Sequence, residues 1–544
     1  MMTKRCLGGI GALWASALLT ACGGSGGSGG TPTPPPPPPP APAPAPYTLT
    51  PSTAKGSFVA GYPQSISLSA KQTVAFVGVA YIQVSADAAV IHSPISAVPN
   101  TDGTVTITIQ PLASLAPGHY TGNFTVDVCA DANCASPLAG APFKVPYDFT
   151  AISPNGGATA YNLSTLSALP GATDWGMFQG NAAHTGFVPV TLQPSAFNRR
   201  WRWDAGSNNG MQWEPSVITT GAGMFYVSNG PDYDSQQAGH ALFAYKEDDG
   251  SLVWQHSFGD LAFPTTNPPA FSGGRVFIAA GSQESTNMFA FDAATGTLDF
   301  KSQMASQWEH YFAPTIFNGA VYTDGGEYGG MYAFDAAGGT QKFYVGAAQY
   351  DGWTPAVDAT HAYSYTAGNL GIYDNQSGAL IANIADPNFS WNGYTSDIAP
   401  VLGAANTVYA GNLSNKTSNA IANFDTLNDV VRWSVHGAFS GNPAYAAGTL
   451  FAANNAPVEL VAYNEADGSQ QWAWTPPAAD GSFVSDVLVT SNLVFVSTAA
   501  NTYAIDRGTH QAVWSDASSG SLALSANGIL YIKGAYSIVA INLH

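Results

Sequence analysis

The sequence has few charged residues, and those of positive sign are the scarcest. Only 9% of its 544 residues are charged, against about 25% in an average soluble domain. Its 16 lysines and arginines are outnumbered by 35 aspartates and glutamates, which gives a net charge of −19 at pH 7. Such a chain repels phosphate backbones, and no basic cluster stands out beyond Arg199-Arg200. We therefore expect no nucleic-acid partner.

Long apolar runs are also missing, apart from one near the N-terminus. Lys4-Arg5 precede an apolar stretch from Leu7 to Leu19, and the small residues Thr20-Ala21 follow it. This order is typical of a secretory signal. The stretch is shorter than the about 20 residues that cross a bilayer as a helix. Residues 1–21 are therefore predicted to be a cleaved signal peptide.

The end of this signal, Leu19-Thr20-Ala21-Cys22, resembles the lipobox of bacterial lipoproteins. The resemblance implies that Cys22 is lipidated and anchors the chain in a bilayer, and Gly23 at the next position favours the outer membrane. We expect an outer-membrane lipoprotein that faces the periplasm or the cell surface; the alternative is an ordinary signal with a chance cysteine. Residues 22–46 are rich in Gly and Ser and then in Pro and Ala, which predicts a flexible coil followed by a stiff polyproline II linker.

Cysteine is scarce as well, with four in the chain. Cys6 lies in the signal and Cys22 is the lipidation candidate, so Cys129 and Cys134 remain for the folded part. Two cysteines five residues apart in an oxidising compartment favour a structural disulfide. The alternative, a catalytic dithiol, is more typical of cysteines that are separated by two residues.

Residues 47–152 contain short β-branched or alternating runs, such as Ser65–Ser69, Thr104–Ile109 and Tyr120–Val128. About a hundred residues of this pattern, divided by turn-forming residues, predict a β-sandwich. The segment Leu115–Gly122 resembles the late hairpin of bacterial Ig-like domains. The resemblance implies an N-terminal Ig-like β-sandwich.

From residue 198 to residue 544 the sequence repeats itself. One recurring string has Ala-aromatic-Asp, then a glycine turn, then an aromatic residue four positions after the glycine, as in Ala290-Phe291-Asp292 with Gly296 and Phe300. Prolines such as Pro269 and Pro314 precede short apolar runs in step with this string. Phased strings with a period of about 43 residues predict units of four strands, which are propeller blades.

The full motif, Ala-x-Asp-x-x-x-Gly-x-x-x-Trp, resembles the tryptophan-docking repeat of the PQQ-like propeller superfamily. In this motif the glycine allows a tight hairpin, and the tryptophan can lie between neighbouring blades. The segment Trp175–Gly186, within the connecting residues 153–197, resembles the one that precedes the first blade in this superfamily. The last copy, Ala540-Ile541-Asn542, lacks its tryptophan strand, and pairing it with Asn198–Trp203 closes the ring. We expect an all-β chain with an eight-bladed β-propeller, with seven blades as the alternative count.

The same superfamily contains quinoprotein dehydrogenases, in which PQQ stacks on a tryptophan and on a ring of two adjacent cysteines, and Glu, Asn and Asp hold Ca²⁺. The propeller region of this chain contains no cysteine. No His-x-x-x-His or Gly-x-Ser-x-Gly pattern stands out in its repeats. We therefore expect no catalytic residue, no metal and no cofactor; the alternative is a PQQ-dependent dehydrogenase with PQQ and Ca²⁺.

Aromatic and acidic residues gather in the segments that lead into the proline-marked strands. Because these connections meet at one mouth of a propeller channel, their side chains surround a single funnel. Exposed aromatics with a few polar groups are typical of binding sites, whereas repeat-phased aromatics also pack between blades. The candidate ligand-binding residues are Trp213, Glu214, Trp308, Glu309, Tyr311, Asp351, Trp353, Trp391 and Tyr394.

These features favour a non-enzymatic scaffold that binds a protein, or an envelope or extracellular polymer, through the propeller mouth. In its anchor and propeller the chain is similar to the lipoprotein subunit of the outer-membrane barrel assembly machine, although the sandwich and the Pro-rich linker depart from that subunit. An adhesin or glycan-binding protein is a further alternative. We expect His184 and His310 to be hydrogen-bonded structural residues rather than ligands.

Overall fold

The computed structural model describes residues 47–544 except 60–62, 64, 74–80, 101–103, 113, 117, 139–140, 153–158, 205–214, 229–239, 260–264, 283–284, 307–309, 392–397 and 412–419. The predicted signal peptide, Cys22 and the linker lie outside these residues. In the described part the chain is all-β, as predicted, and its helical elements are the short 3₁₀ turns η1 (Phe178–Gly180), η2 (Pro194–Ala196), η3 (Gly326–Tyr328) and η4 (Ala478–Asp480). None of the helices there has the length and apolarity that crossing a membrane requires.

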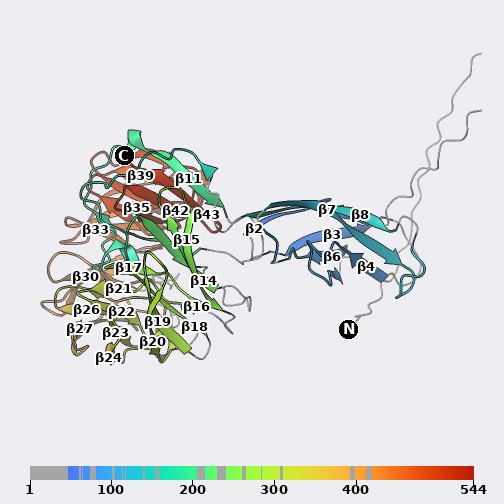
Figure 1. Ribbon diagram of the computed structural model, residues 1–544. Helices are drawn as coiled ribbons and strands as arrows, with labels where there is room; N and C mark the ends of the chain where they lie inside the picture. The colour runs from blue at the N-terminus through green and yellow to red at the C-terminus, as the bar shows by residue number, and fades with distance from the viewer. Residues whose placement is uncertain are drawn as a thin grey trace, which may run out of the picture. The chain divides into compact units, whose positions relative to one another are not determined.

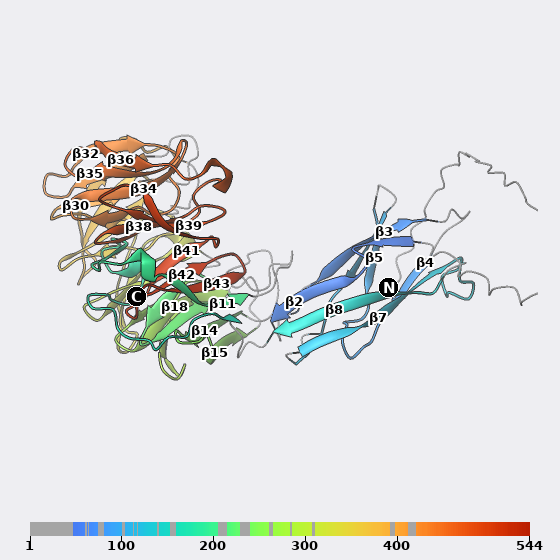
Figure 2. The same cartoon turned by 90° about the horizontal axis from the view of Figure 1, so that it is seen from above.

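The described residues divide into two compact units, one up to Ala151 and one after it. The first unit has two four-stranded sheets that share one core (Figures 1 and 2). In β6, threonines alternate with the buried Val105, Ile107 and Ile109, because successive side chains of a strand point to opposite faces. One sheet has the order β1 (Tyr47–Thr50), β3 (Ile66–Gln72), β6 (Thr104–Ile109), β5 (Ser96–Pro99), and the other β2 (Ala54–Val59), β8 (Phe143–Ile152), β7 (Gly118–Cys129), β4 (Tyr81–Ser85).

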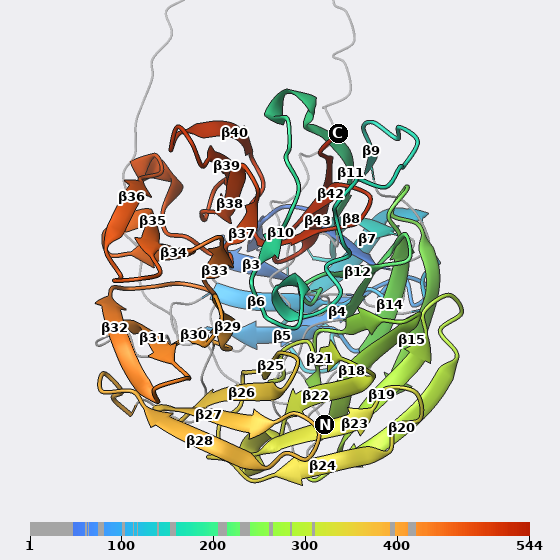
Figure 3. The same cartoon turned by 90° about the vertical axis from the view of Figure 1, so that its left-hand side faces the viewer.

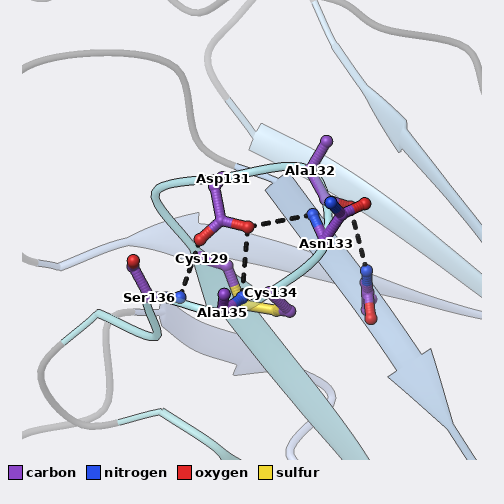
Figure 4. The surroundings of a disulfide bond; sticks show 8 residues. Cys129, Asp131, Ala132, Asn133, Cys134, Ala135 and Ser136 are labelled. Atoms are coloured by element: carbon purple, nitrogen blue, oxygen red, sulfur yellow. Dashed lines mark hydrogen bonds between the residues drawn. A yellow bond between two sulfur atoms is a disulfide. The ribbon is translucent and has the colours of Figure 1, made fainter.

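A disulfide joins Cys129, at the end of β7, to Cys134 in the following loop, with the two Cα atoms 5.1 Å apart (Figure 4). The carboxylate of Asp131 accepts hydrogen bonds from the backbone N–H groups of Asn133, Ala135 and Ser136 at 3.0, 3.1 and 2.7 Å. These bonds, led by the one from Ala135, lower the pKa of Asp131. The bridge and this carboxylate hold one loop together from both sides.

The second unit contains eight sheets in its described residues, and they follow one another around a common centre (Figure 3). The first four are β12 (Thr219–Gly221), β13 (Met224–Ser228), β14 (His240–Lys246), β15 (Leu252–Gly259); β16 (Thr265–Thr266), β17 (Ala270–Ser272), β18 (Arg275–Ser282), β19 (Ser285–Asp292), β20 (Leu298–Met304); β21 (Thr315–Phe317), β22 (Ala320–Asp324), β23 (Met331–Asp335), β24 (Gln341–Val345); and β25 (Ala356–Val357), β26 (His361–Thr366), β27 (Asn369–Asp374), β28 (Leu380–Ala385).

The remaining four sheets continue the series and draw three strands from earlier in the chain. They are β29 (Val401–Leu402), β30 (Thr407–Ala410), β31 (Ala420–Asp425), β32 (Val430–His436); β33 (Ala444–Ala446), β34 (Thr449–Asn455), β35 (Val458–Asn464), β36 (Gln470–Trp474); β10 (Phe187–Val188), β37 (Leu488–Thr490), β38 (Leu493–Ser497), β39 (Thr502–Asp506), β40 (Ala512–Asp516); and β41 (Ser521–Leu524), β42 (Ile529–Lys533), β43 (Ser537–Asn542), β11 (Asn198–Asp204), β9 (Thr159–Ala160). A contact between β41 and β12 joins the last sheet to the first.

The repeat motif places an aromatic ring of one sheet against the glycine turn of the next. Trp254, on the outer strand β15, donates a hydrogen bond from Nε1 to the carbonyl of Ala293 in the second sheet at 2.8 Å. Trp433 donates in the same way to Glu465 at 2.8 Å. Gly296 has a φ of 70°, and a Cβ at this position would lie 2.6 Å from the Trp254 ring. Glycine is needed there for both the turn and the close approach. The intersheet position predicted for the motif's tryptophan is confirmed.

The ring is joined by a strand from the start of the unit. β11 pairs antiparallel with β43, with Trp201 opposite Ala540, which is the pairing that the sequence predicts. Trp201 is fully buried and donates from Nε1 to the carbonyl of Glu247 in the first sheet at 2.9 Å. The fully buried Arg200 donates to the carboxylate of Asp248. β11 therefore supplies the docking indole that the last repeat lacks.

Candidate functional site

Residues 174–190, which we name the central segment, lie inside the ring of sheets and include η1 and β10 (Figure 3). The inner strand of each sheet lies towards the centre of the ring. The N–H groups on its free edge, which faces the centre, have no further strand of that sheet to bond with. Carbonyls of the central segment accept hydrogen bonds from six of these strands, so one short stretch of chain satisfies edges around the ring. The donor and acceptor pairs are Thr220 and Trp175, Phe271 and Gly176, Val357 and Ala182, Leu402 and Ala183, Tyr445 and Thr185, and Val489 and Gly186.

The central segment is held in an unusual backbone conformation by its surroundings. Gly186 has a φ of 60°, and a Cβ there would lie 2.8 Å from the carbonyl oxygen of Val487. Gln179 and His184 are not glycines, yet they have φ values of 50° and 55°. Both are buried, with 3% and 0% of their surface exposed. A left-handed backbone conformation at a residue other than glycine costs about 1–3 kcal/mol of folding free energy. Packing and hydrogen bonds in the ring centre therefore hold the segment in this conformation.

His184 is a hydrogen-bonded structural residue, as predicted. Its Nδ1 lies 2.9 Å from the carbonyl oxygen of Pro400, and its Nε2 lies 2.8 Å from Oγ1 of Thr315. Burial lowers the pKa of His184 to about 3. The ring is therefore neutral, and it donates from Nδ1 and accepts at Nε2. It links the central segment to two sheets, and no ligand role follows.

A cavity of about 520 Å³ lies beside the central segment, within the range of about 300–1,000 Å³ that is typical of ligand pockets. Residues of the central segment, which bonds to the inner strands, form part of the lining, and we name this part the floor of the cavity. Val217 in the wall is 36% exposed, which shows that the cavity opens to solvent. The floor contains Trp175, Met177, Phe178 and Gln179, and the walls contain residues at or before strand starts, including Pro215–Thr219, Asn267, His310–Ala313, Asn442, Asp486, Ser521 and Leu522, with Lys533 at the end of β42.

Two phenylalanines form an aromatic surface in this cavity. The rings of Phe178 and Phe312 stack with centroids 4.7 Å apart and planes 8° apart. Phe178 is buried, whereas Phe312 keeps part of its surface exposed. Because Phe178 covers one face of Phe312, the accessible part of Phe312 belongs to the cavity wall.

Asp486 supplies a carboxyl group on the wall of the seventh sheet. Its Oδ1 accepts hydrogen bonds from the backbone N–H of Asn442 at 2.6 Å and from Nδ2 of Asn442 at 3.2 Å. Oδ2 accepts none from the residues that the structure describes. Burial raises the pKa of Asp486, and the bonds from Asn442 oppose this rise. The group is therefore oriented through one oxygen, which leaves the other for a ligand.

The residues predicted for the mouth are in different places. Tyr311 is buried and lines the cavity; its N–H donates to Oδ1 of Asn267 at 3.0 Å. Trp353 is fully buried in an apolar cluster between two sheets, away from the cavity, and its Nε1 donates to the carbonyl of Tyr350. Asp351 is half-buried, and Trp391 is 65% exposed. The other five, Trp213, Glu214, Trp308, Glu309 and Tyr394, lie outside the described residues.

Several cavity residues were not selected from the sequence. Trp175 and Phe178 belong to the segment that resembles the one before the first blade, but a segment before a repeat carries no signal that it folds back into the ring centre. Asn442 and Asp486 could have been found, because each stands two residues before an inner strand in equivalent copies of the repeat. Their hydrogen bond to each other joins the sixth and seventh sheets across the mouth.

The described cavity residues do not fit PQQ with Ca²⁺. Ca²⁺ takes about six to eight oxygen ligands, with carboxylates prominent among them. Asp486 is the one carboxylate in the described lining, and Oδ1 of this residue is already engaged by Asn442. Across the described parts of the chain no three His, Cys, Asp or Glu side chains are grouped to hold a metal ion.

Comparison with known proteins supports the repeat assignment. A family model described as outer membrane protein assembly factor BamB (PQQ_2) matches residues 239–433 and 417–541, which confirms the predicted PQQ-like propeller repeat. The sequence matches none of the curated proteins.

The similar solved structures include the following two, both at low sequence identity. A europium-containing methanol dehydrogenase is 12% identical with a TM-score of 0.48, over 66% of this chain and 89% of that chain. Sqt1 of Saccharomyces cerevisiae is 9% identical with a TM-score of 0.46, over 62% of this chain and 97% of that chain. Because the family matches together extend from residue 239 to residue 541, more than half of the 544 residues, the chain belongs to the PQQ_2 family of propellers, described as outer membrane protein assembly factor BamB.

Proposed function

We propose that this chain is a non-enzymatic binding scaffold that takes a protein, or an envelope or extracellular polymer, at the mouth of its propeller channel. The observation that carries the proposal is the cavity of about 520 Å³, whose floor is built by the chain's own central segment. Its lining combines apolar and aromatic side chains with a small number of polar groups, which is the composition of binding pockets.

The proposal includes the parts of the chain around this site. In it, the eight sheets are the blades of an eight-bladed propeller over residues 198–544, and residues 47–152 form an Ig-like sandwich. The family's description as an outer membrane assembly factor supports a periplasmic or outer-membrane-associated protein. In the finer form of the proposal, acylated Cys22 anchors the chain in the outer membrane, and residues 22–46 hold the folded part away from the bilayer, on the periplasmic or the surface side.

Site-specific photo-crosslinking in the native membrane tests this role. A photoreactive residue at Val217, in the cavity wall, is compared with one at Val253 on the outer strand β15; these valines are 36% and 40% exposed. We expect a discrete crosslinked product from position 217 that is missing from position 253. The same yield at both positions, or no product at position 217, would contradict a mouth-binding scaffold.

A titration with PQQ and Ca²⁺ tests the absence of an enzymatic role. We expect no stoichiometric quinone absorption band when both are added to the purified full-length chain, because the described lining offers one carboxylate. A stoichiometric band would replace the scaffold by a quinoprotein dehydrogenase.

A further inference from the structure

The cavity contains few polar groups that its own protein neighbours leave available. Asn267 donates to the carbonyl of Ala279 and accepts from the N–H of Tyr311, so its amide is used. Gln179 donates to carbonyls of the sixth sheet. Ser216 donates to the carbonyl of Val217 and accepts from the N–H of Ser228. Asn267 and Ser216 therefore have little capacity left for a ligand, whereas Oε1 of Gln179 accepts no hydrogen bond from the described residues.

Asp486 and Ser521 are two of the wall residues that retain hydrogen-bonding capacity. Oδ2 of Asp486 accepts no hydrogen bond within the described chain, and the hydroxyl of Ser521 makes none there either. Asp486 precedes the inner strand of the seventh sheet, and Ser521 begins the inner strand of the eighth. The two groups therefore belong to neighbouring walls of one cavity, and both suit a ligand that presents hydroxyl groups.

Another part of the lining is aromatic and apolar. Phe312 rests on Phe178 and keeps part of its surface accessible, and Pro215, Val217 and Leu522 add apolar area. A ligand that fills this space must have an apolar face for the ring and polar groups at its edge.

The charge of the lining disfavours strongly charged ligands. Asp486 and Lys533 are its one acidic and one basic residue in the described part, with His310 at the rim. Burial raises the pKa of Asp486, which disfavours its charged form. A neutral hydroxyl group can hydrogen-bond to this carboxyl group whether or not it is ionised. The described lining has no cluster of cationic side chains for a polyanion and no group of carboxylates for an organic cation.

From these features of one lining we propose that the cavity binds a neutral oligosaccharide, with a sugar ring stacked on Phe312 and hydroxyl groups along the chain of sugars bonded to Asp486 and Ser521. A pyranose ring has an apolar C–H face and an equatorial rim of hydroxyls, which matches the aromatic surface and the two polar walls. The inference rests on the proposed scaffold function, since it names the class of polymer that the mouth takes.

Isothermal titration of the purified full-length chain with neutral oligosaccharides tests the inference, using maltotriose, cellotriose and chitotriose as probes. We expect at least one of them to bind. Asp486→Asn, which removes an acceptor of hydroxyl protons, and Phe312→Leu, which removes the ring face, should each weaken it by about tenfold or more. Matched controls are Asp480→Asn and Phe317→Leu, since both residues are buried or half-buried outside the cavity; they should change the affinity less than twofold.

Thermal unfolding of every variant is measured alongside. Where Asp486→Asn fails to fold, Ser521→Ala replaces it, because the Ser521 hydroxyl makes no hydrogen bond to the described residues; it should weaken the sugar while leaving the melting temperature unchanged. The inference is overturned if none of the three sugars binds, if binding is equal in cavity and control variants, or if tetramethylammonium or an acidic trisaccharide binds in their place. If the crosslink at position 217 forms but no sugar binds, the carbohydrate proposal is wrong and the scaffold proposal is retained. If neither the crosslink nor sugar binding is observed, the scaffold proposal is wrong as well.

Discussion

Glu247 is fully buried at the junction of the first and eighth sheets, and we expect it to make the stability of the propeller depend on pH. Its Oε2 accepts a hydrogen bond from Nδ2 of Asn527 at 2.7 Å, whereas Oε1 has no partner in the described residues. Burial raises the pKa of Glu247 from 4.5 to about 7, and the charge of Asp174 adds to the rise. A carboxyl group with a raised pKa in the folded state contributes stability below its unfolded pKa, and this contribution is lost as the pH rises through the folded pKa.

The substitution Glu247→Gln keeps the shape of the side chain and removes its charge. A rise from 4.5 to about 7 corresponds to about 3 kcal/mol of unfolding free energy, at about 1.4 kcal/mol per pKa unit. We expect the variant and the native chain to unfold alike near about pH 4, and the variant to be more stable by about 3 kcal/mol near about pH 8, where native Glu247 is ionised. Differential scanning calorimetry across this pH range measures the difference.

Glu465 offers a matched control, because it occupies the same repeat position in the sixth sheet. Its carboxylate oxygens accept hydrogen bonds from the hydroxyl of Tyr445 and the N–H of Ala404, both at 2.8 Å. Glu465→Gln therefore disturbs satisfied hydrogen bonds and should lower the melting temperature at both ends of the range. A constant offset between Glu247→Gln and the native chain at all pH values would refute the argument from burial.

Two further predictions concern the glycine turns and the central segment. Gly296→Ala should lower the unfolding free energy by about 2–4 kcal/mol, since it adds a Cβ 2.6 Å from the Trp254 ring to the cost of a positive φ; Gly319→Ala, at a φ of 76° with open space around it, should cost less than half as much in the same denaturation assay, and equal losses would speak against the interblade contact. His184→Gln should flatten the acid side of the stability curve: a histidine whose folded pKa is lowered to about 3 stabilises the fold above its unfolded pKa, and about 5 kcal/mol is lost as the pH falls from about 6.5 to about 3. An unchanged acid slope in urea denaturation would show that His184 is not buried as described.

The repeat architecture could be predicted because each of its contacts recurs. The aromatic of one copy, such as Trp254, packs on the glycine turn of the next copy, such as Gly296. The same pattern of glycine turn and docking aromatic recurs several times along the chain. The sequence also predicts that the last copy lacks its tryptophan strand. Trp201 on β11 fills the corresponding position. Local patterns of this kind are legible because the same physical requirement selects the same residue type each time.

The mouth residues were less predictable because equivalent sequence positions meet different neighbours. Phe312 and Trp353 stand at the same distance before inner strands, yet the first lines the cavity and the second is enclosed between sheets with its indole bonded to Tyr350. The position of a residue within the repeat predicts the end of the blade at which its side chain lies. It does not give the direction in which packing turns that side chain.

The sequence by itself determined the all-β class, the propeller repeat and the strand that joins the ring, since these follow from periodic turns and docking aromatics. Only the tertiary structure decided that residues 174–190 enter the ring centre, that Phe178 meets Phe312 and that Asp486 meets Asn442. The sequence of the central segment occurs once in the chain, so no recurring pattern predicts which residues it contacts. Its place depends on backbone edges from six sheets, and those edges come together only when the chain has closed on itself.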